Sequence, residues 1–392
     1  MNDNKSENLS SEEGTMNVVI NSANSSIISK QLHRYKGTDP VVIVPSTINK
    51  ILTWAFKNNT YLREIYIEGS VEIEYGAFTE CTALESVVFN KRSIKIDSTA
   101  FMNCSSLRSF ALSEGISKIK NGVFEGCKAL EKITIPSSVK VIGVEAFSGC
   151  TSLKHAILQE GLLEIRDSAF HGCVSLTGIS IPNSVKRIGF GAFSDCKSLK
   201  NLFIPDSVEK LSKFFAKGAT SLEVLAIPGC VKKVDNEYLT SDSLTAIQLG
   251  NGVESIEAFA FWGLDKLQAI IIPPSVKRIA SDAFITLSAI KKFEPTLLMN
   301  MFAAKEMVEA KKGFKRVLDF ISDKKNDEIK EYSEEYAHNM PDELLKSDKF
   351  IKDFNSEINN MITIYGVSGS TAEKYAVQNG FGFEDLENLY VT

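Results

Sequence analysis

Cysteine is the residue type whose spacing in this chain most resembles a chemical site. Six of the seven cysteines recur at intervals of 23 residues, and they are Cys81, Cys104, Cys127, Cys150, Cys173 and Cys196. Thiols in a regular series could ligate a metal, form disulfides or act as nucleophiles. A zinc site, however, requires Cys or His ligands in close pairs, and no Cys-x-x-Cys pair occurs in this sequence. The spacing therefore does not favour metal ligation.

The residues that replace cysteine in later repeats of the same pattern indicate what the position is for. Ala219, Leu264 and Leu287 occupy it, and all three are apolar. A free thiol behaves as a small hydrophobic group, so the series predicts buried thiols in a core, with ligation or disulfides as the alternative. Cys230 lies outside the series and is the one candidate for an exposed, reactive thiol.

Histidines and nucleotide-binding or hydrolase motifs add no catalytic constellation. The four histidines (His33, His155, His171 and His338) share no cluster, and His155 and His171 are predicted at the surface. No HExxH, GxSxG, Walker or GxGxxG motif occurs in a supporting strand-helix context. The loop before Ser370 could cradle an anion at a helix start, but Ser370 and Glu373 form a capping box that explains it. No catalytic residue, metal or cofactor is predicted.

Composition excludes several classes of protein. The chain has 392 residues, of which 44% are hydrophobic and 24% charged, with a formal net charge of -5. These values indicate a soluble globular protein and disfavour global disorder and nucleic-acid binding. No apolar run is long enough to insert into a membrane, and residues 1–15 lack a signal-peptide pattern. As given, the chain is expected in the cytoplasm, or at the cell surface or secreted if a signal peptide has been removed.

Phenylalanine reveals the organisation that positions these residues. The chain has 24 Phe, and one series recurs every 22 or 23 residues: Phe56, Phe78, Phe101, Phe124, Phe147, Phe170 and Phe193. The same register continues through Ala216, Leu239, Phe261 and Phe284, which makes about eleven units. Self-similarity at this period predicts a solenoid, in which each unit buries its apolar face against its neighbours.

Apolar residues within each unit keep fixed distances from the register Phe. A Leu follows six residues later, then an alternating pair such as Ile133 and Ile135, and then Pro136. This alternation predicts a short strand with one face inward, ended by a proline that has no N–H for the sheet. A second apolar pair such as Val139 and Ile142 predicts another extended segment or a tight turn before the next Phe.

The unit Leu-x-x-Ile-x-Ile-Pro-x-x-Val-x-x-Ile-x-x-x-Ala-Phe-x-x-Cys resembles the BspA-like leucine-rich repeat family. The resemblance covers residues 40–295 and returns in a closing motif around Ile364-Tyr365-Gly366 and Gly369 to Ala376. It implies a β-rich leucine-rich repeat solenoid of about eleven units. The family includes surface proteins of anaerobic bacteria and some parasitic protists, with adhesion proposed for a few. A shared scaffold does not by itself define a function.

Composition and pattern divide the chain into five parts. Residues 1–15 are predicted to be a disordered tail, 16–55 an N-terminal cap and 56–295 the solenoid. Residues 296–360 have helical spacing and are predicted to form an α-helical insertion or cap. Residues 361–392 form the closing motif, with a final strand and a helix over 371–379 that ends at Gly380.

The outward positions of the predicted strands are the candidate binding surface. They carry less charge than a purely solvated face, and the candidate contact residues are Tyr66, His155, Ile157, Phe203, Val224, Ala226 and Ile271. An exposed apolar patch there would mark an interaction surface. Alternatively, β-branched and aromatic residues are present only because they favour strands.

These observations favour a non-catalytic binding protein that presents an elongated sheet to a protein or peptide, or to a glycan. An adhesion-like role is compatible with this surface. A second hypothesis places an enzymatic or regulatory activity in residues 297–360, and a third is a structural spacer without a specific ligand.

Overall fold

The computed structural model describes residues 18–21, 23–90, 94–239, 241–280, 283–284 and 362–386. The predicted tail over 1–15 and the predicted helices over 296–360 lie outside the described residues. The chain divides into two compact units, residues 1–231 and 232–392, and each is described by itself. Both are β-solenoids, which confirms the fold class predicted from the 22–23-residue period.

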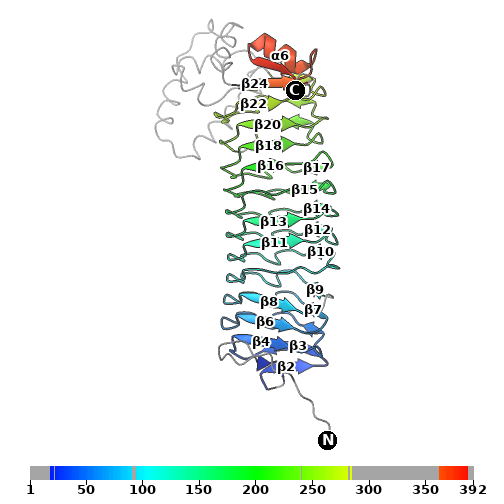
Figure 1. Ribbon diagram of the computed structural model, residues 1–392, viewed down its shortest axis with the longest axis vertical. Coiled ribbons are helices and arrows are strands. Elements are labelled where there is room, and N and C mark those ends of the chain that lie inside the picture. Colours follow the sequence, from blue (N-terminus) through cyan, green and yellow to red (C-terminus); the bar gives the residue numbers. More distant parts are fainter. Residues whose placement is uncertain are drawn as a thin grey trace, which may run out of the picture. The chain divides into compact units, whose positions relative to one another are not determined.

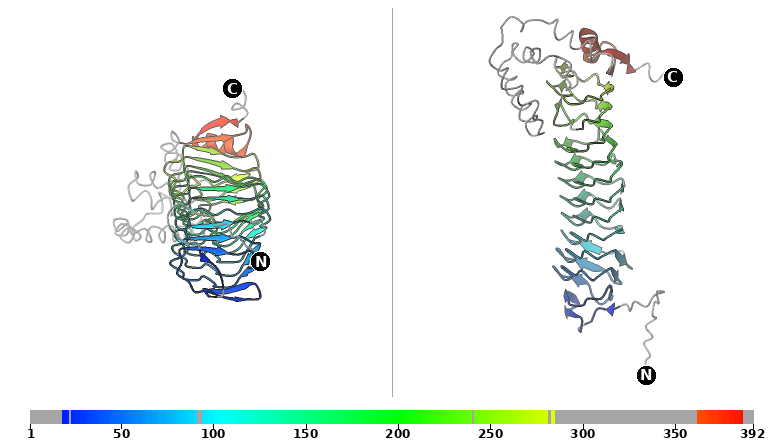
Figure 2. Two further views of the ribbon diagram at one scale, coloured as in Figure 1. Left: turned by 60° about the horizontal axis from the view of Figure 1, so that its bottom comes forward. Right: turned by 90° about the vertical axis from the view of Figure 1, so that its left-hand side faces the viewer.

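Most turns of chain in the first unit contribute one short strand to each of two rows (Figures 1 and 2), and the turns that contain Ser109 and Gly178 have only isolated bridges in the front row. The front strands face the viewer in Figure 1 and are β1 (Val18–Val19), β4 (Val41–Val44), β6 (Glu64–Ile67), β8 (Ser86–Phe89), β11 (Lys132–Ile135), β13 (His155–Leu158), β16 (Asn201–Phe203) and β18 (Val224–Ile227). Within each sheet the neighbours pair in parallel and in register; for example, Tyr66 on β6 lies beside Val88 on β8. The front row is interrupted between β8 and β11 and between β13 and β16.

The side strands form the second row and correspond to the second apolar pair of each unit. They are β2 (Ser25–Ile28), β3 (Gln31–Tyr35), β5 (Lys50–Ile51), β7 (Val71–Ile73), β9 (Ile94–Ile96), β10 (Lys118–Ile119), β12 (Val141–Ile142), β14 (Glu164–Ile165), β15 (Arg187–Ile188) and β17 (Lys210–Leu211). Of the two outcomes predicted for the second apolar pair, an extended segment is the one observed. β2 and β3 form an antiparallel hairpin, and β3 then pairs in parallel with β5.

The second unit repeats this plan and adds the closing motif. Its front strands are β20 (Ala246–Leu249), β22 (Ala269–Ile271), β24 (Thr363–Gly366) and β25 (Gly382–Asp385), and its side strands are β19 (Lys233–Val234), β21 (Ser255–Ile256) and β23 (Arg278–Ile279). Helix α6 (Thr371–Asn379) starts at Ser370, whose Oγ accepts a hydrogen bond from the Glu373 N–H. It ends at Gly380, which is left-handed with φ 76°, as predicted. α6 is far too short to cross a bilayer, and the part of the chain that the structure describes has no helix that could.

The register phenylalanines of the first unit form one stacked column inside the solenoid. From Phe56 to Phe193, successive rings are nearly parallel and their centroids lie 4.7 to 5.9 Å apart. All seven rings are buried. Ring stacking and apolar burial therefore act at the same spacing as the strands, so each repeat is held in register by its neighbours.

Two substitutions interrupt the regular plan in different ways. In the repeat after Phe193, the buried ring comes one residue earlier than in the other repeats. The Phe170 N–H donates to the carbonyl of Ala192, and the equivalent Phe193 N–H donates to the carbonyl of Phe215. Phe215 therefore takes the alanine position, and its ring is fully buried beside Ala216. Volume in the core is preserved although the order of the two residues is reversed.

Phe110 stands where other units carry the first strand isoleucine. Its ring makes edge-on contacts with Phe101 and Phe124, at 5.0 and 4.8 Å between centroids. Phe101 and Phe124 are 5.9 Å apart, the widest step in the column, and only an isolated bridge from Ser109 to Lys132 replaces a front strand in this unit. The oversized side chain at this position thus coincides with the widest step of the stack and with an interruption of the front row.

The column predicts the stability of core variants. Phe147 stacks on Phe124 and Phe170 at 5.4 and 5.3 Å, so Phe147→Ala should lower the free energy of unfolding by about 3–5 kcal/mol in a urea titration. The control is Phe190→Ala, because the Phe190 ring is 56% exposed, and its effect should be smaller than about 1 kcal/mol. Equal losses for the two variants would contradict the column as the main source of stability.

Candidate functional site

The six periodic thiols form a second buried column beside the phenylalanines. Each Sγ donates a hydrogen bond to the carbonyl of the register Phe one repeat earlier, at 3.1 Å for Cys81 to Phe56 and 3.2 Å for the others. All six are free and buried, which confirms the prediction of core thiols. Burial raises the pKa of the Cys81 and Cys196 thiols to about 12 and raises the pKa of the four between them as well. These thiols are therefore protonated and poor nucleophiles at neutral pH.

The remaining sulfur and imidazole groups do not converge. Cys230 is partly exposed, and His33 and His155 are exposed. His171 Nδ1 lies 3.8 Å from an Asp195 carboxylate oxygen at the surface, while His338 is outside the described residues. Among the residues that the structure describes, no group of His, Cys, Asp and Glu could hold a metal ion.

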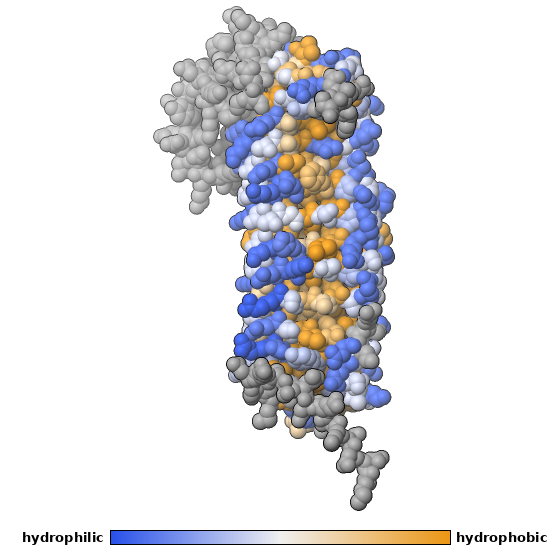
Figure 3. All heavy atoms as spheres, in the orientation of Figure 1, coloured by the Kyte–Doolittle hydropathy of each residue, from blue (hydrophilic) through white to orange (hydrophobic). Residues whose placement is uncertain are grey.

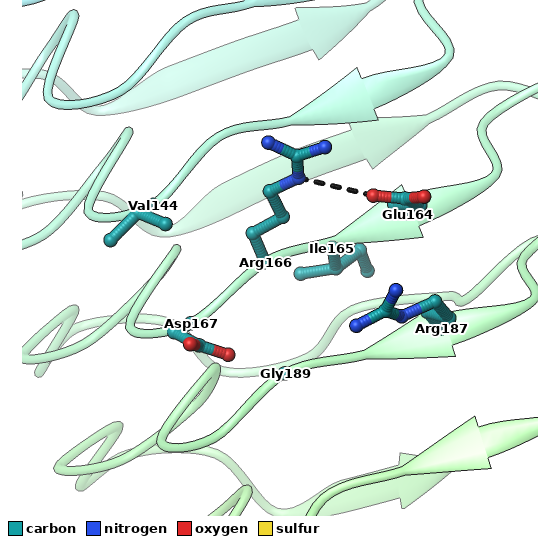
Figure 4. Close-up of a pocket in the computed structure, with 7 residues that line it drawn as sticks. All are labelled: Val144, Glu164, Ile165, Arg166, Asp167, Arg187 and Gly189. Atoms are coloured by element: carbon teal, nitrogen blue, oxygen red, sulfur yellow. Dashed lines mark hydrogen bonds and ion pairs between the residues drawn. The ribbon is translucent and has the colours of Figure 1, made fainter.

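A shallow hollow lies along side strands β14 and β15 (Figure 4). It is lined by Val144, Glu164, Ile165, Arg166, Asp167, Arg187 and Gly189. Arg166 Nε is 3.0 Å from Glu164 Oε2, and Asp167 Oδ1 accepts the Phe190 N–H at 2.9 Å. Both carboxylates are thus engaged in an ion pair or a turn. The hollow offers no nucleophile with an adjacent base.

The front strands of the first unit place the predicted contact residues on one outward face. Ile157 and Phe203 project from β13 and β16 and are 45% and 56% exposed, while His155 is also exposed. Val224 and Ala226 on β18 are half-buried. Parallel register places Asn201 beside Val224 and Phe203 beside Ala226, so these residues form two adjacent columns along the face.

Tyr66 lies on the same face and is half-buried on β6. Its hydroxyl donates to Glu64 Oε2 at 2.8 Å, and this hydrogen bond to a carboxylate raises the pKa of the Tyr66 phenol. Ile157 is four steps along the outward column from Tyr66, so the structure does not bring Tyr66 together with the Ile157–Phe203 group.

Apolar surface runs down the middle of this face, with hydrophilic side chains on both sides of it (Figure 3). Part of the flanking charge is paired from one repeat to the next. Arg63 Nη2 lies 2.7 Å from Glu85, and the pairs Glu131 with Lys154 and Lys200 with Glu223 are each 3.8 Å apart. Opposite charges on successive repeats therefore neutralise one another along the flank and leave little single-sign field there.

Ile271 belongs to the second unit and is half-buried on β22. It lies beside Gln248 on one side and Tyr365 on the other. Tyr365 thus extends the outward column of this unit, although about ninety residues separate it from Ile271 in the sequence. Tyr365 was not predicted as a contact residue, because the 22–23-residue period does not extend to it. Its strand, Ile364-Tyr365-Gly366, would have to be aligned with Ile270-Ile271-Ile272 by the similarity of the two short segments alone.

Comparison with known proteins adds a family match and several structural likenesses. The family model for the BspA type leucine-rich repeat region matches in six copies, over residues 26–154, 71–186 and 163–291. No curated protein matches the chain.

Three solved structures illustrate the likenesses. A leucine-rich cell surface protein from Faecalibacterium prausnitzii is 25% identical, with 68% of this chain and 89% of that one covered and a TM-score of 0.42. A leucine-rich repeat protein from T. pallidum is 25% identical, with coverages of 60% and 82% and a TM-score of 0.29. One from Bacteroides ovatus is 24% identical, with coverages of 68% and 90% and a TM-score of 0.33.

The buried thiols predict a distinctive alkaline behaviour. Folding raises a thiol pKa above its unfolded value near 8.5, so its contribution to stability is complete below about pH 8.5 and is lost as the pH rises toward the folded value. Cys127→Ala should be less stable than wild type at pH 7.5. The difference should shrink by about 1.4 kcal/mol for each pH unit above about 9, because the variant lacks the titrating group.

Urea titrations at several pH values under reducing conditions measure this difference. Val123→Ala is the control, because Val123 is also buried but has no titrating group, and its difference from wild type should not depend on pH in this way. A constant difference for Cys127→Ala from pH 7.5 to 10.5 would contradict the burial of a neutral thiol.

Proposed function

Because this chain belongs to the BspA-type leucine-rich repeat family, we propose that it is a non-catalytic binding protein whose front face captures a protein or peptide. The observation that carries the proposal is the exposure of Ile157 and Phe203, at 45% and 56%, on strands whose inward residues are buried. Exposed apolar side chains that cluster on a rigid sheet are typical of interaction surfaces.

Rigidity is what makes this face suitable for recognition. Leu202, between Asn201 and Phe203 on β16, is completely buried and fixes the strand to the core. The outward side chains consequently have little backbone freedom to lose when a partner binds, which favours affinity. From Ile43 to Ala226 the outward column makes eight steps of about 4.8 Å, so the face extends for about 38 Å and can accommodate an extended segment.

The charge pattern bears on the kind of complex that would form. Arg63 with Glu85 and Lys200 with Glu223 already neutralise each other on the flank. Binding should therefore depend mainly on apolar contact and shape, and it should weaken only slightly as the salt concentration rises.

Two other hypotheses remain distinct from this one. Activity in residues 297–360 concerns a region outside the described residues, and the carboxylates of the side-strand hollow already have partners. A structural spacer would leave the front face unused. The exposed Phe203 ring is the feature that favours binding over the spacer, because a spacer gains nothing from an exposed aromatic residue.

The binding hypothesis predicts a selective loss in Phe203→Asp. A phage-displayed library of random dodecapeptides is first enriched on the full wild-type chain, and the enriched pool is then measured against variants. Phe203→Asp should weaken binding of the pool by about tenfold or more, because a charge replaces a central apolar contact. The matched control is Phe190→Asp: Phe190 is equally exposed at 56% but follows side strand β15, and this change should alter binding by less than about twofold.

Two other outcomes of this experiment would contradict the proposal. Equal binding to wild type and Phe203→Asp would place the binding surface elsewhere on the chain. Failure of any peptide or folded protein library to enrich would favour the spacer. Thermal unfolding of both variants confirms that the solenoid remains folded.

A further inference from the structure

One rung of the front face has glycine, and so no side chain, at its first outward position. His155, Gly178 and Asn201 are aligned in parallel on successive repeats, and Gly178 is bridged to both neighbours without forming a continuous strand. Two residues further along the same rungs lie Ile157, Ser180 and Phe203. The rung of Gly178 and Ser180 therefore carries little side-chain volume between the rung of His155 and Ile157 and the rung of Asn201 and Phe203, and we call this low place the slot.

Nothing in the local structure requires glycine in this slot. Gly178 is not in the left-handed region, and a Cβ built on it would meet no heavy atom within 4 Å. Other repeats carry Lys132 and Val224 in the same column, so the position accepts larger residues. A glycine in a sheet position that larger residues can occupy often marks a place where a ligand approaches closely.

The dimensions of the slot match one aromatic ring. Neighbouring rungs are about 4.8 Å apart and successive outward positions about 7 Å apart, so the opening is one side chain thick and two positions long. The interior shows that rings fit this spacing in this protein, because Phe147 and Phe170 stack at 5.3 Å on consecutive repeats. A ring placed above Ser180 would lie between Ile157 and Phe203 at a similar distance from each.

The two ends of the slot differ in polarity. Ile157 and Phe203 make one end apolar, whereas His155 and Asn201 make the other end capable of hydrogen bonds, and all four side chains are exposed. Tyrosine and tryptophan have the matching character, since an apolar ring carries an O–H or N–H at one end. A leucine or valine would fill the volume without meeting the polar end.

We propose that the slot over Gly178 receives a tyrosine or tryptophan side chain of a protein partner, and that this side chain is the anchor of the complex. The inference rests on the proposed function of the front face and specifies the chemistry that the face recognises. Phe203 then lies on one side of the slot. The absence of a side chain at Gly178 is the feature that admits the anchor.

Filling the slot tests the inference. Gly178→Val places a side chain in open space and suits a strand, so the thermal midpoint should stay the same or rise. The dodecapeptide pool enriched on wild type should bind this variant about tenfold more weakly or worse, and Gly178→Ala should show a smaller loss. Ser109→Val is the matched control, because it adds the same side chain to the same column three repeats away, and it should change binding by less than about twofold.

Sequencing of the pool supplies a second readout, and most enriched peptides should share one tyrosine or tryptophan. Enriched peptides without a shared aromatic residue, or undiminished binding to Gly178→Val, would overturn the slot. In either case a loss with Phe203→Asp would leave the function of the face intact. If Phe203→Asp binds as well as wild type, or if no peptide or folded protein library is enriched, the proposed function fails and the slot fails with it.

Discussion

The structure depends on the burial of equivalent side chains at one fixed repeat distance. In the first unit, each register Phe stacks on the Phe of the next repeat, and each periodic thiol reaches back to a Phe carbonyl. Neither residue could be satisfied within a single repeat, because its partners belong to the turns before and after it. The interior column therefore fixes the spacing of the strands, and the strands fix the positions of the outward side chains.

This constraint separates the two faces of every front strand. Inward positions such as Leu202 must fit the column and tolerate little change, whereas outward positions such as Phe203 and Ser180 are free of that requirement. Specificity can consequently arise on the surface without altering the scaffold. The slot over Gly178 is an instance: the surface lacks one side chain while Ile179, the next residue, remains buried in the core.

The sequence predicts the regular part of this structure well. The Phe and Cys series and the first strand of each repeat follow from periodicity, because a buried column imposes the same residue type at the same spacing. The helix over 371–379 follows from the capping box of Ser370 and Glu373 and from Gly380 at its end. Irregular features are less predictable. The reversal of Phe215 and Ala216 and the wedge of Phe110 depend on how particular volumes pack, which a pattern of apolar residues does not specify.

The candidate site is only partly predictable for a related reason. Alternation along the strand was enough to identify Ile157 and Phe203 as outward residues. The open space above Gly178 depends on how all neighbouring atoms are placed around it, which requires coordinates. The place of Tyr365 in the second unit depends on a strand pairing across a long intervening segment, and a repeat period cannot reveal it.

Amide hydrogen exchange in wild type and Phe147→Ala tests the central claim most directly, because it reports the stability of each repeat separately. If the column holds the face, exchange should accelerate most at Ile133 and Ala156, whose strands flank Phe147, and the effect should decrease with each repeat away from it. Acceleration confined to the turn that contains residue 147, with unchanged protection in β11 and β13, would show that the outward face does not depend on the buried rings.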